Sequence, residues 1–205
     1  EFINSNPGLK SRFNKYFHFP DYSADEMMEI YEAKTADGSD RFQPDGHDIV
    51  FDNVSFAYDN EQVLDGVSFT AKEGEITALV GPSGSGKSTC ARLAARLWDV
   101  SGGTIRVGGV DIQTVDPEAL LTDYSMVFQD VILFDDTVME NIRLGKHGAS
   151  DEEVLAAAKA ANCDEFVNKL PSGYATPIGE NGAKLSGGER QRISIARALL
   201  KNAPI

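Results

Sequence analysis

Residues 81–89 read GPSGSGKST, and this stretch decides how the rest of the chain is interpreted. It fits the pattern G-x-x-x-x-G-K-[ST], in which a glycine-rich loop surrounds phosphate oxygens. Residues 76–80 (ITALV) precede it and predict a short strand that is buried on both faces. Residues 90–98 follow it and are rich in Ala, Leu and Arg, which favour a helix. Strand, loop and helix in this order predict a phosphate site at a helix N-terminus. A glycine-rich turn before a core helix is the alternative.

The residue types of this phosphate loop (residues 81–89) have separate physical roles. Glycines allow backbone angles that other residues resist, so successive N–H groups can turn inward around an anion. Lys87 adds a positive charge near the terminal phosphates, and the hydroxyl of Ser88 is placed to ligate Mg²⁺. The predicted phosphate contacts are Gly81, Pro82, Ser83, Gly84, Ser85, Gly86, Lys87, Ser88 and Thr89.

Composition limits the classes to which the chain can belong. Its 205 residues suit one domain or slightly more, and a hydrophobic content of 41% is enough for a packed core. No apolar run approaches the ~20 residues of a membrane-spanning helix, and no signal peptide opens the chain. The start at Glu1, without Met, is compatible with a fragment. A net charge of −13 argues against a nucleic-acid surface, so we expect no nucleic-acid partner. The two cysteines, Cys90 and Cys163, suit a reducing cytosol.

The first part of the chain differs from the rest. Residues 1–32 have a basic aromatic half and an acidic half, and we interpret them as an N-terminal extension. They resemble the segment of CbxX-type AAA+ ATPases that carries the arginine finger, which would fall on Arg12. That family's own phosphate loop, acidic motif and first sensor are missing upstream, so a chimeric reading frame is the alternative. Residues 33–48 are polar and contain Gly and Pro, and they predict a linker.

Strand patterns flank the phosphate loop. Residues 49–58 (IVFDNVSFAY) and 63–71 (VLDGVSFTA) predict a pair of strands, and 104–107 and 125–128 predict two more. Tyr58 ends the first strand, where an exposed aromatic ring could stack on an adenine base for roughly 1–3 kcal/mol. Ordinary strand packing is the alternative.

Gln129 follows the predicted strand 125–128, at the edge where ligands bind in open α/β sheets. Its amide both donates and accepts hydrogen bonds, so it could contact a magnesium-bound water and an attacking water together. A solvent-facing loop glutamine is the alternative.

Pairs of a hydroxyl residue and a glutamate, three positions apart, predict capping boxes at helix starts. We expect helices within 135–143 and over 151–162 and 186–200, and a short helical turn at Asp116-Pro117. The capping pairs are Thr137 with Glu140, Ser150 with Glu153, and Ser186 with Glu189. The predicted buried positions are Val154, Leu155, Ala158 and Ala161 in one helix, and Ile193, Ala196 and Leu200 in the last.

The start of the last helix predicts a second anion site. Gly187 and Gly188 each cost about 1 kcal/mol in a first helical turn, and close approach to an anion is one reason to keep them. One nucleotide in one chain rarely needs two such sites. Two copies related by a two-fold axis could use both, each copy covering the ligand of the other.

Together these motifs are similar to a known family. Residues 49–205 resemble the nucleotide-binding domain of ABC transporters, with 81–88 as Walker A and 185–189 (LSGGE) as a variant of the signature LSGGQ. Gln129 falls on the Q-loop and Tyr58 on the adenine-stacking aromatic. The resemblance implies an α/β fold with a P-loop NTPase core, an antiparallel β subdomain and a helical signature subdomain. It also implies ATP and Mg²⁺ as cofactors, catalytic roles for Lys87 and Gln129, and metal contacts from Ser88 and Gln129. The implied signature contacts are Ser186, Gly187, Gly188 and Glu189.

The spacing resembles the exporter-type branch, in which the ATPase follows a membrane domain on the same chain. The resemblance implies two partners, a transmembrane domain and a second ABC cassette that is identical or different. It also implies a place at the cytoplasmic face of the cell membrane.

The end of the chain departs from the family pattern. It stops at Ala203-Pro204-Ile205, where the family continues with the Walker B strand, its aspartate and glutamate, and a later switch histidine. Asp130 and Asp135 are no substitute, because they do not end a long apolar strand. We therefore expect 49–205 to be a partial domain, incomplete at the C-terminus and inactive in hydrolysis alone. A soluble ABC-type ATPase without a transport role, or a truncated or fused product that binds nucleotide without turnover, are the alternatives to an exporter cassette.

Overall fold

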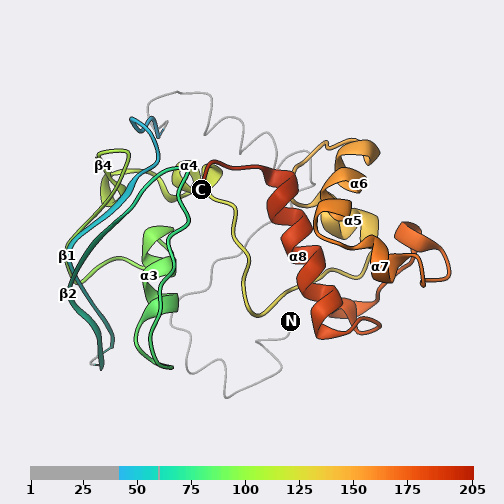
Figure 1. Ribbon diagram of the computed structural model, residues 1–205, viewed down its shortest axis with the longest axis horizontal. Helices are drawn as coiled ribbons and strands as arrows, with labels where there is room; N and C mark the ends of the chain where they lie inside the picture. Colours follow the sequence, from blue (N-terminus) through green and yellow to red (C-terminus); the bar gives the residue numbers. More distant parts are fainter. Residues whose placement is uncertain (1–41, 60) are drawn as a thin grey trace, which may run out of the picture. The chain divides into compact units, whose positions relative to one another are not determined.

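The computed structural model describes residues 42–59 and 61–205 (Figure 1). The predictions for residues 1–32, Arg12 among them, lie outside the described residues, as does the linker prediction up to residue 41. The strands are β1 (Ile49–Tyr58), β2 (Glu61–Ala71), β3 (Gly102–Val107) and β4 (Val110–Asp111). The helices are α3 (Lys87–Ala94), α4 (Pro117–Thr122), α5 (Val138–Arg143), α6 (Asp151–Ala160), α7 (Asp164–Val167) and α8 (Gly187–Lys201). Single 3₁₀ turns are η1 (Ile112–Thr114), η2 (Gly173–Ala175) and η3 (Glu180–Gly182).

The strands form one antiparallel sheet in the order β2-β1-β3-β4. β1 has the predicted bounds, whereas β2 and β3 begin earlier than predicted, at Glu61 and Gly102. The buried residues of β1 are Phe51, Val54 and Phe56, and an irregularity between Phe51 and Val54, where Asn53 takes a φ of 52°, keeps all three on one face. That face packs on α3, so the helix of the phosphate loop lies against the sheet (Figure 1). The shared core includes Phe51, Val54, Phe56, Leu64, Leu93 and Ile105.

A second core is helical. α8 packs against α5 and α6, and the predicted buried positions Ile193, Ala196 and Leu200 are in the contact (Figure 1). α6 ends at Ala160, two residues before the predicted end; Val154 and Ala158 within it and Ala161 directly after it are buried as predicted, but Leu155 is 39% exposed. The prediction for Leu155 is wrong because the contact face of this short helix is narrow and Leu155 points beside it, toward solvent.

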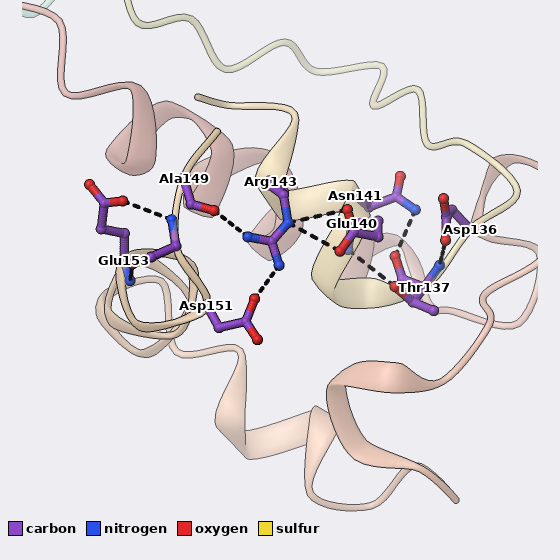
Figure 2. Close-up of polar contacts among 9 residues, drawn as sticks. Asp136, Thr137, Glu140, Asn141, Arg143, Ala149, Asp151 and Glu153 are labelled. Atoms are coloured by element: carbon purple, nitrogen blue, oxygen red, sulfur yellow. Dashed lines mark hydrogen bonds and ion pairs between the residues drawn. The ribbon is translucent and has the colours of Figure 1, made fainter. Parts of the chain in front are cut away.

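The helix starts follow the local sequence. Capping boxes are confirmed at Ser150 with Glu153 and at Ser186 with Glu189, and Asp116 caps α4. At α5 only half of the predicted box forms. The Thr137 hydroxyl accepts from the N–H of Glu140, while the N–H of Thr137 donates to Asp136 (Figure 2). The carboxylate of Glu140 is instead 3.1 Å from Nε of Arg143, so this ion pair replaces the second half of the box.

Two predicted strands do not form. Residues 76–80 and 125–128 have no strand or helix assignment, and Ile76 and Val80 are 100% and 89% exposed. A strand buried on both faces needs neighbours to bond its backbone, and among the described residues none pairs with 76–80. Residue 125 shows one trace of parallel pairing: Ser125 N donates to Ile205 O at 2.6 Å, and Ile205 N donates to Asp123 O at 3.0 Å. The antiparallel sheet and the helical part are thus confirmed, and the central parallel strands are not formed.

The helix predicted over 90–98 is also shifted. α3 begins earlier, at Lys87, and ends at Ala94. Arg96 takes a φ of 50°, the left-handed conformation with which helices commonly end.

Candidate nucleotide site

The phosphate loop is built for an anion at the start of α3. The helix N-cap is Gly86, at φ 85°, and no side chain caps the first turn. There is also no acidic residue in that turn, so the N-terminal amides and the positive end of the helix dipole are left for a ligand. A Cβ atom on Gly86 would lie 2.6 Å from Cδ2 of Leu64 in β2. Glycine is therefore required here both by the backbone angle and by contact with the sheet.

Lys87 lies across the loop that it follows. Its ammonium donates to the backbone oxygens of Gly81 at 3.0 Å and Pro82 at 2.6 Å, and reaches the hydroxyl of Ser85 at 3.4 Å. Residues 81–85 are exposed, so a phosphate can approach the ammonium and the loop amides from solvent.

The last two loop residues have different environments. Ser88 is exposed, whereas Thr89 is 7% exposed and joins the packed side of α3. Cys90 is also buried, and burial raises the pKa of its thiol, which supports packing over reactivity. Of these two hydroxyl residues, Ser88 is thus the one that is exposed to solvent.

Tyr58 is half-buried, packed against other aromatic rings. Its ring meets Phe56 edge to face at 4.7 Å between centroids and Trp98 at 5.4 Å. The Tyr58 hydroxyl is buried, without a hydrogen-bond partner in the described part of the chain. Strand packing, the alternative interpretation, accounts for these contacts, and adenine stacking stays a prediction. Trp98 is 51% exposed and was not predicted to contribute; the sequence offered no signal beyond its being the only tryptophan.

Gln129 lies in an exposed bend between the two cores. The strand that was expected to carry it does not form, so its position depends on how residues 124–125 and 132–134 are held. Tyr124 Oη donates to Ala94 O at 2.8 Å, at the end of α3. Ile132 O accepts from Arg197 of α8 at 2.7 Å. The chain before Gln129 is therefore hydrogen-bonded to the end of α3, and the chain after it is hydrogen-bonded to α8.

The second predicted anion site is the signature turn (residues 186–189). The Ser186 hydroxyl donates to Glu189 Oε2 at 2.8 Å, and the same oxygen accepts from Ser186 N at 2.7 Å. These hydrogen bonds lower the pKa of Glu189, so its carboxylate is ionised at neutral pH. Gly187 and Gly188 occupy the first helical turn, where backbone amides have no partner within the helix.

The two predicted phosphate sites do not meet within this chain. Among residues 42–59 and 61–205, no hydrogen bond or ion pair joins the phosphate loop to the signature turn. Separate sites are what a ligand shared between two copies would require.

Oxygen ligands for a hard cation are available. Mg²⁺ prefers oxygen donors and keeps several waters, so a hydroxyl and an amide oxygen near a phosphate tail are sufficient protein ligands. Ser88 and Gln129 are both exposed and carry such oxygens, so they fit this chemistry. In the described residues no three His, Cys, Asp or Glu side chains gather as a metal cluster.

Within the described part of the chain, no helix is both long and apolar enough to span a bilayer.

Comparison with known proteins agrees with this geometry. The profile of the ABC transporter family matches residues 64–205. The chain is 52% identical over 157 residues to the mycobactin import ATP-binding/permease protein IrtB of Mycolicibacterium thermoresistibile, covering 77% of this chain and 27% of that protein. It is 53% identical over 153 residues to the ATP-dependent lipid A-core flippase of Syntrophus aciditrophicus, covering 75% and 26%. A solved structure of a bacterial Atm1-family ABC exporter with ATP bound superposes with a TM-score of 0.78 at 43% identity, covering 88% of this chain and 33% of that one.

The chain thus spans about a quarter to a third of the length of these relatives. The matched region contains the whole phosphate loop and the signature turn. The chain therefore belongs to the ABC transporter family of ATPases, of which it carries the ATP-binding domain.

Proposed function

We propose that the chain is the ATP-binding cassette of a membrane exporter, and that it holds the triphosphate of ATP in the phosphate loop. The observation that carries the proposal is the uncapped N-terminus of α3, with its left-handed Gly86 and the ammonium of Lys87 beside it. The loop amides and Lys87 would together neutralise the phosphate tail. Tyr58, half-buried beside the exposed Trp98, is the proposed adenine contact.

Mg²⁺ is part of the proposal. Ser88 and Gln129 would hold it, and the ion would offset negative charge on the phosphates. Gln129 would also orient a water. Because these two residues come from different parts of the fold, metal binding reports on how the chain around Gln129 is placed.

A second cassette is proposed to complete the site. Its support is the separation of the two anion-binding helix starts within one chain, each with free glycine amides. In a head-to-tail pair the signature turn of one copy would cover the phosphates held by the other.

The membrane partner is proposed from the relatives, which are named as ATP-binding/permease proteins and a flippase. A transmembrane domain would place the cassette at the cytoplasmic face of the cell membrane. One of these relatives is named for import. A chain that binds nucleotide without turnover is the second candidate.

Binding of a fluorescent ATP analogue to the wild-type chain and to Lys87→Ala tests the proposal. Loss of a hydrogen bond to a charged group costs about 1.5–3 kcal/mol, which corresponds to a Kd about 10- to 150-fold higher. Lys72→Ala is the matched control, because Lys72 is an exposed lysine outside the loop, directly after β2. An unchanged Kd in Lys87→Ala, or equal losses in both variants, would contradict a phosphate role for Lys87. ATP-dependent dimerisation, followed by sedimentation with Ser186→Ala as comparison, tests the second cassette.

A further inference from the structure

Arg197, in the last half of α8, bonds to two distant parts of the chain. Its Nε donates to Asn141 O at 2.6 Å and its Nη2 to Asn141 Oδ1 at 2.8 Å, 56 residues away. Its Nη1 donates to Ile132 O at 2.7 Å, 65 residues away. Three N–H donors of one planar guanidinium are used at once, in a fixed fork geometry that a lysine ammonium does not have. Burial lowers the pKa of Arg197, which marks a charge partly removed from water.

Asn141, which accepts from Arg197, is in turn hydrogen-bonded to residues that follow Ile132 in the chain. Its side chain is fully buried. Oδ1 accepts from Phe134 N at 2.9 Å, and Nδ2 donates to Phe134 O at 3.0 Å and to Thr137 O at 2.9 Å. The N–H of Leu133 donates to Asn181 Oδ1 at 3.0 Å. Thus every residue of 132–134 has its backbone held by a side chain from the helical part.

These backbone contacts matter because side-chain burial holds the segment weakly. Ile132 and Phe134 are 70% and 60% exposed, and only Leu133 is buried. Removing the polar contacts would therefore release residues 132–134 with little apolar surface to resist the change.

The other end of the exposed chain is held by the first core. Tyr124 is 5% exposed and its hydroxyl bonds to the last turn of α3, while Ser125 N bonds to Ile205 O. Between these anchors lies the Gln129 segment (residues 126–131). No backbone hydrogen bond in the described part of the chain involves the Gln129 segment. Met126 packs against the first core and Val131 against the helical core, so the exposed stretch 127–130 is held from its two ends.

We propose that Arg197 is a positioning residue, which fixes the Gln129 segment relative to α8 by holding Ile132 and Asn141. This deepens the proposed function, on which its metal-binding consequence rests. Arg197 touches neither nucleotide nor metal. It keeps the downstream anchor in place, so that Gln129 can reach a cation bound at Ser88. The same contact links α8, which starts at the signature turn, to the segment that carries Gln129.

Two measurements on the full chain test the role of Arg197. The first is hydrogen exchange of the Leu133 and Phe134 amides, which should lose about tenfold protection in Arg197→Gln. The second is the ratio of ATP-analogue affinities with and without Mg²⁺, which should fall about fivefold, or about 1 kcal/mol of coupling. Arg197→Lys keeps the charge but not the fork, and should fall between wild type and Arg197→Gln in both measurements.

Arg143→Gln is the matched control (Figure 2). Arg143 also joins a backbone oxygen and side chains, namely Ala149, Glu140 and Asp151, but all within eight residues of itself. In the part of the chain that the structure describes, its side chain forms no hydrogen bond with residues 132–134. Arg143→Gln should lower the thermal midpoint while leaving the Mg²⁺ ratio and the two amides unchanged.

The outcomes separate positioning from general destabilisation. Equal losses in Arg197→Gln and Arg143→Gln, or an unchanged Mg²⁺ ratio in folded Arg197→Gln, would overturn the proposal. If Arg197→Gln does not fold, Arg197→Lys decides by the same criteria. If the wild-type chain binds no ATP analogue, the proposed function fails. The amide exchange then still decides whether Arg197 anchors residues 132–134.

Discussion

Replacing Gly86 with alanine should destabilise the chain far more than the same change at Gly84. Both glycines have left-handed angles, φ 85° and φ 80°. A residue other than glycine pays about 1–2 kcal/mol there. A Cβ on Gly86 would also lie 2.6 Å from Leu64 Cδ2 and 3.3 Å from Val63 Cγ1, whereas a Cβ on Gly84 would have no neighbour within 4 Å. Overpacking adds about 1–3 kcal/mol, so we expect about 2–5 kcal/mol for Gly86→Ala and about 1–2 kcal/mol for Gly84→Ala.

A double-mutant cycle with Leu64→Val separates the two contributions. Valine lacks the Cδ2 atom, and shortening a buried aliphatic side chain by one carbon costs about 0.5–1.5 kcal/mol alone. In that background the cost of Gly86→Ala should drop toward that of Gly84→Ala, which gives a coupling free energy of about 1–3 kcal/mol. Urea unfolding of the four chains, with ATP-analogue binding in parallel, provides the measurement. The reasoning is refuted if Gly86→Ala costs the same in both backgrounds, since contact with β2 would then play no part.

Two further predictions concern the thiols and the signature turn. Cys90 and Cys163 are buried, and desolvation raises the pKa of Cys163 to about 11, so neither should react with a thiol reagent at pH 8 until denaturant is added; fast reaction of the native chain would contradict this burial. Glu189→Gln should keep the capping box, because glutamine serves at this position as well as glutamate. The Glu189 pKa is lowered in the fold, so its stabilising contribution is present above the pKa of the unfolded chain and is lost as pH falls through the lower folded value. Thermal unfolding from pH 7 to pH 3 should therefore show a steeper acid loss in wild type than in Glu189→Gln, and parallel curves would exclude this role.

Local patterns in the sequence predicted local structure well. β1 has the predicted bounds because its ten residues are rich in β-branched and aromatic side chains, which favour a strand locally. The capping boxes at Ser150 and Ser186 need only partners three positions away. The left-handed glycine and lysine of the phosphate loop likewise depend on residues within the motif.

Features that depend on distant partners could not be predicted in this way. The apolar run 76–80 suits a buried strand, but a strand forms only where another backbone pairs with it. Tyr58 was predicted from its place at a strand end, while its contact with Trp98 depends on where α3 ends. Arg197 carried no prediction from the sequence. Its hydrogen bonds to Ile132 and Asn141 join residues that are more than fifty positions apart in the sequence, and no periodic pattern predicts such contacts.

The bonds of Lys87 to its own loop have a consequence for ligand choice. An incoming anion must compete with the main-chain oxygens of Gly81 and Pro82 for the same ammonium. A small monovalent anion has one charge and few acceptor atoms, so binding it would not compensate for the loss of the two existing hydrogen bonds of Lys87. A polyphosphate offers several charges and engages the loop amides at the same moment. The contacts of Lys87 within its loop thereby favour a polyphosphate over chloride or a simple carboxylate.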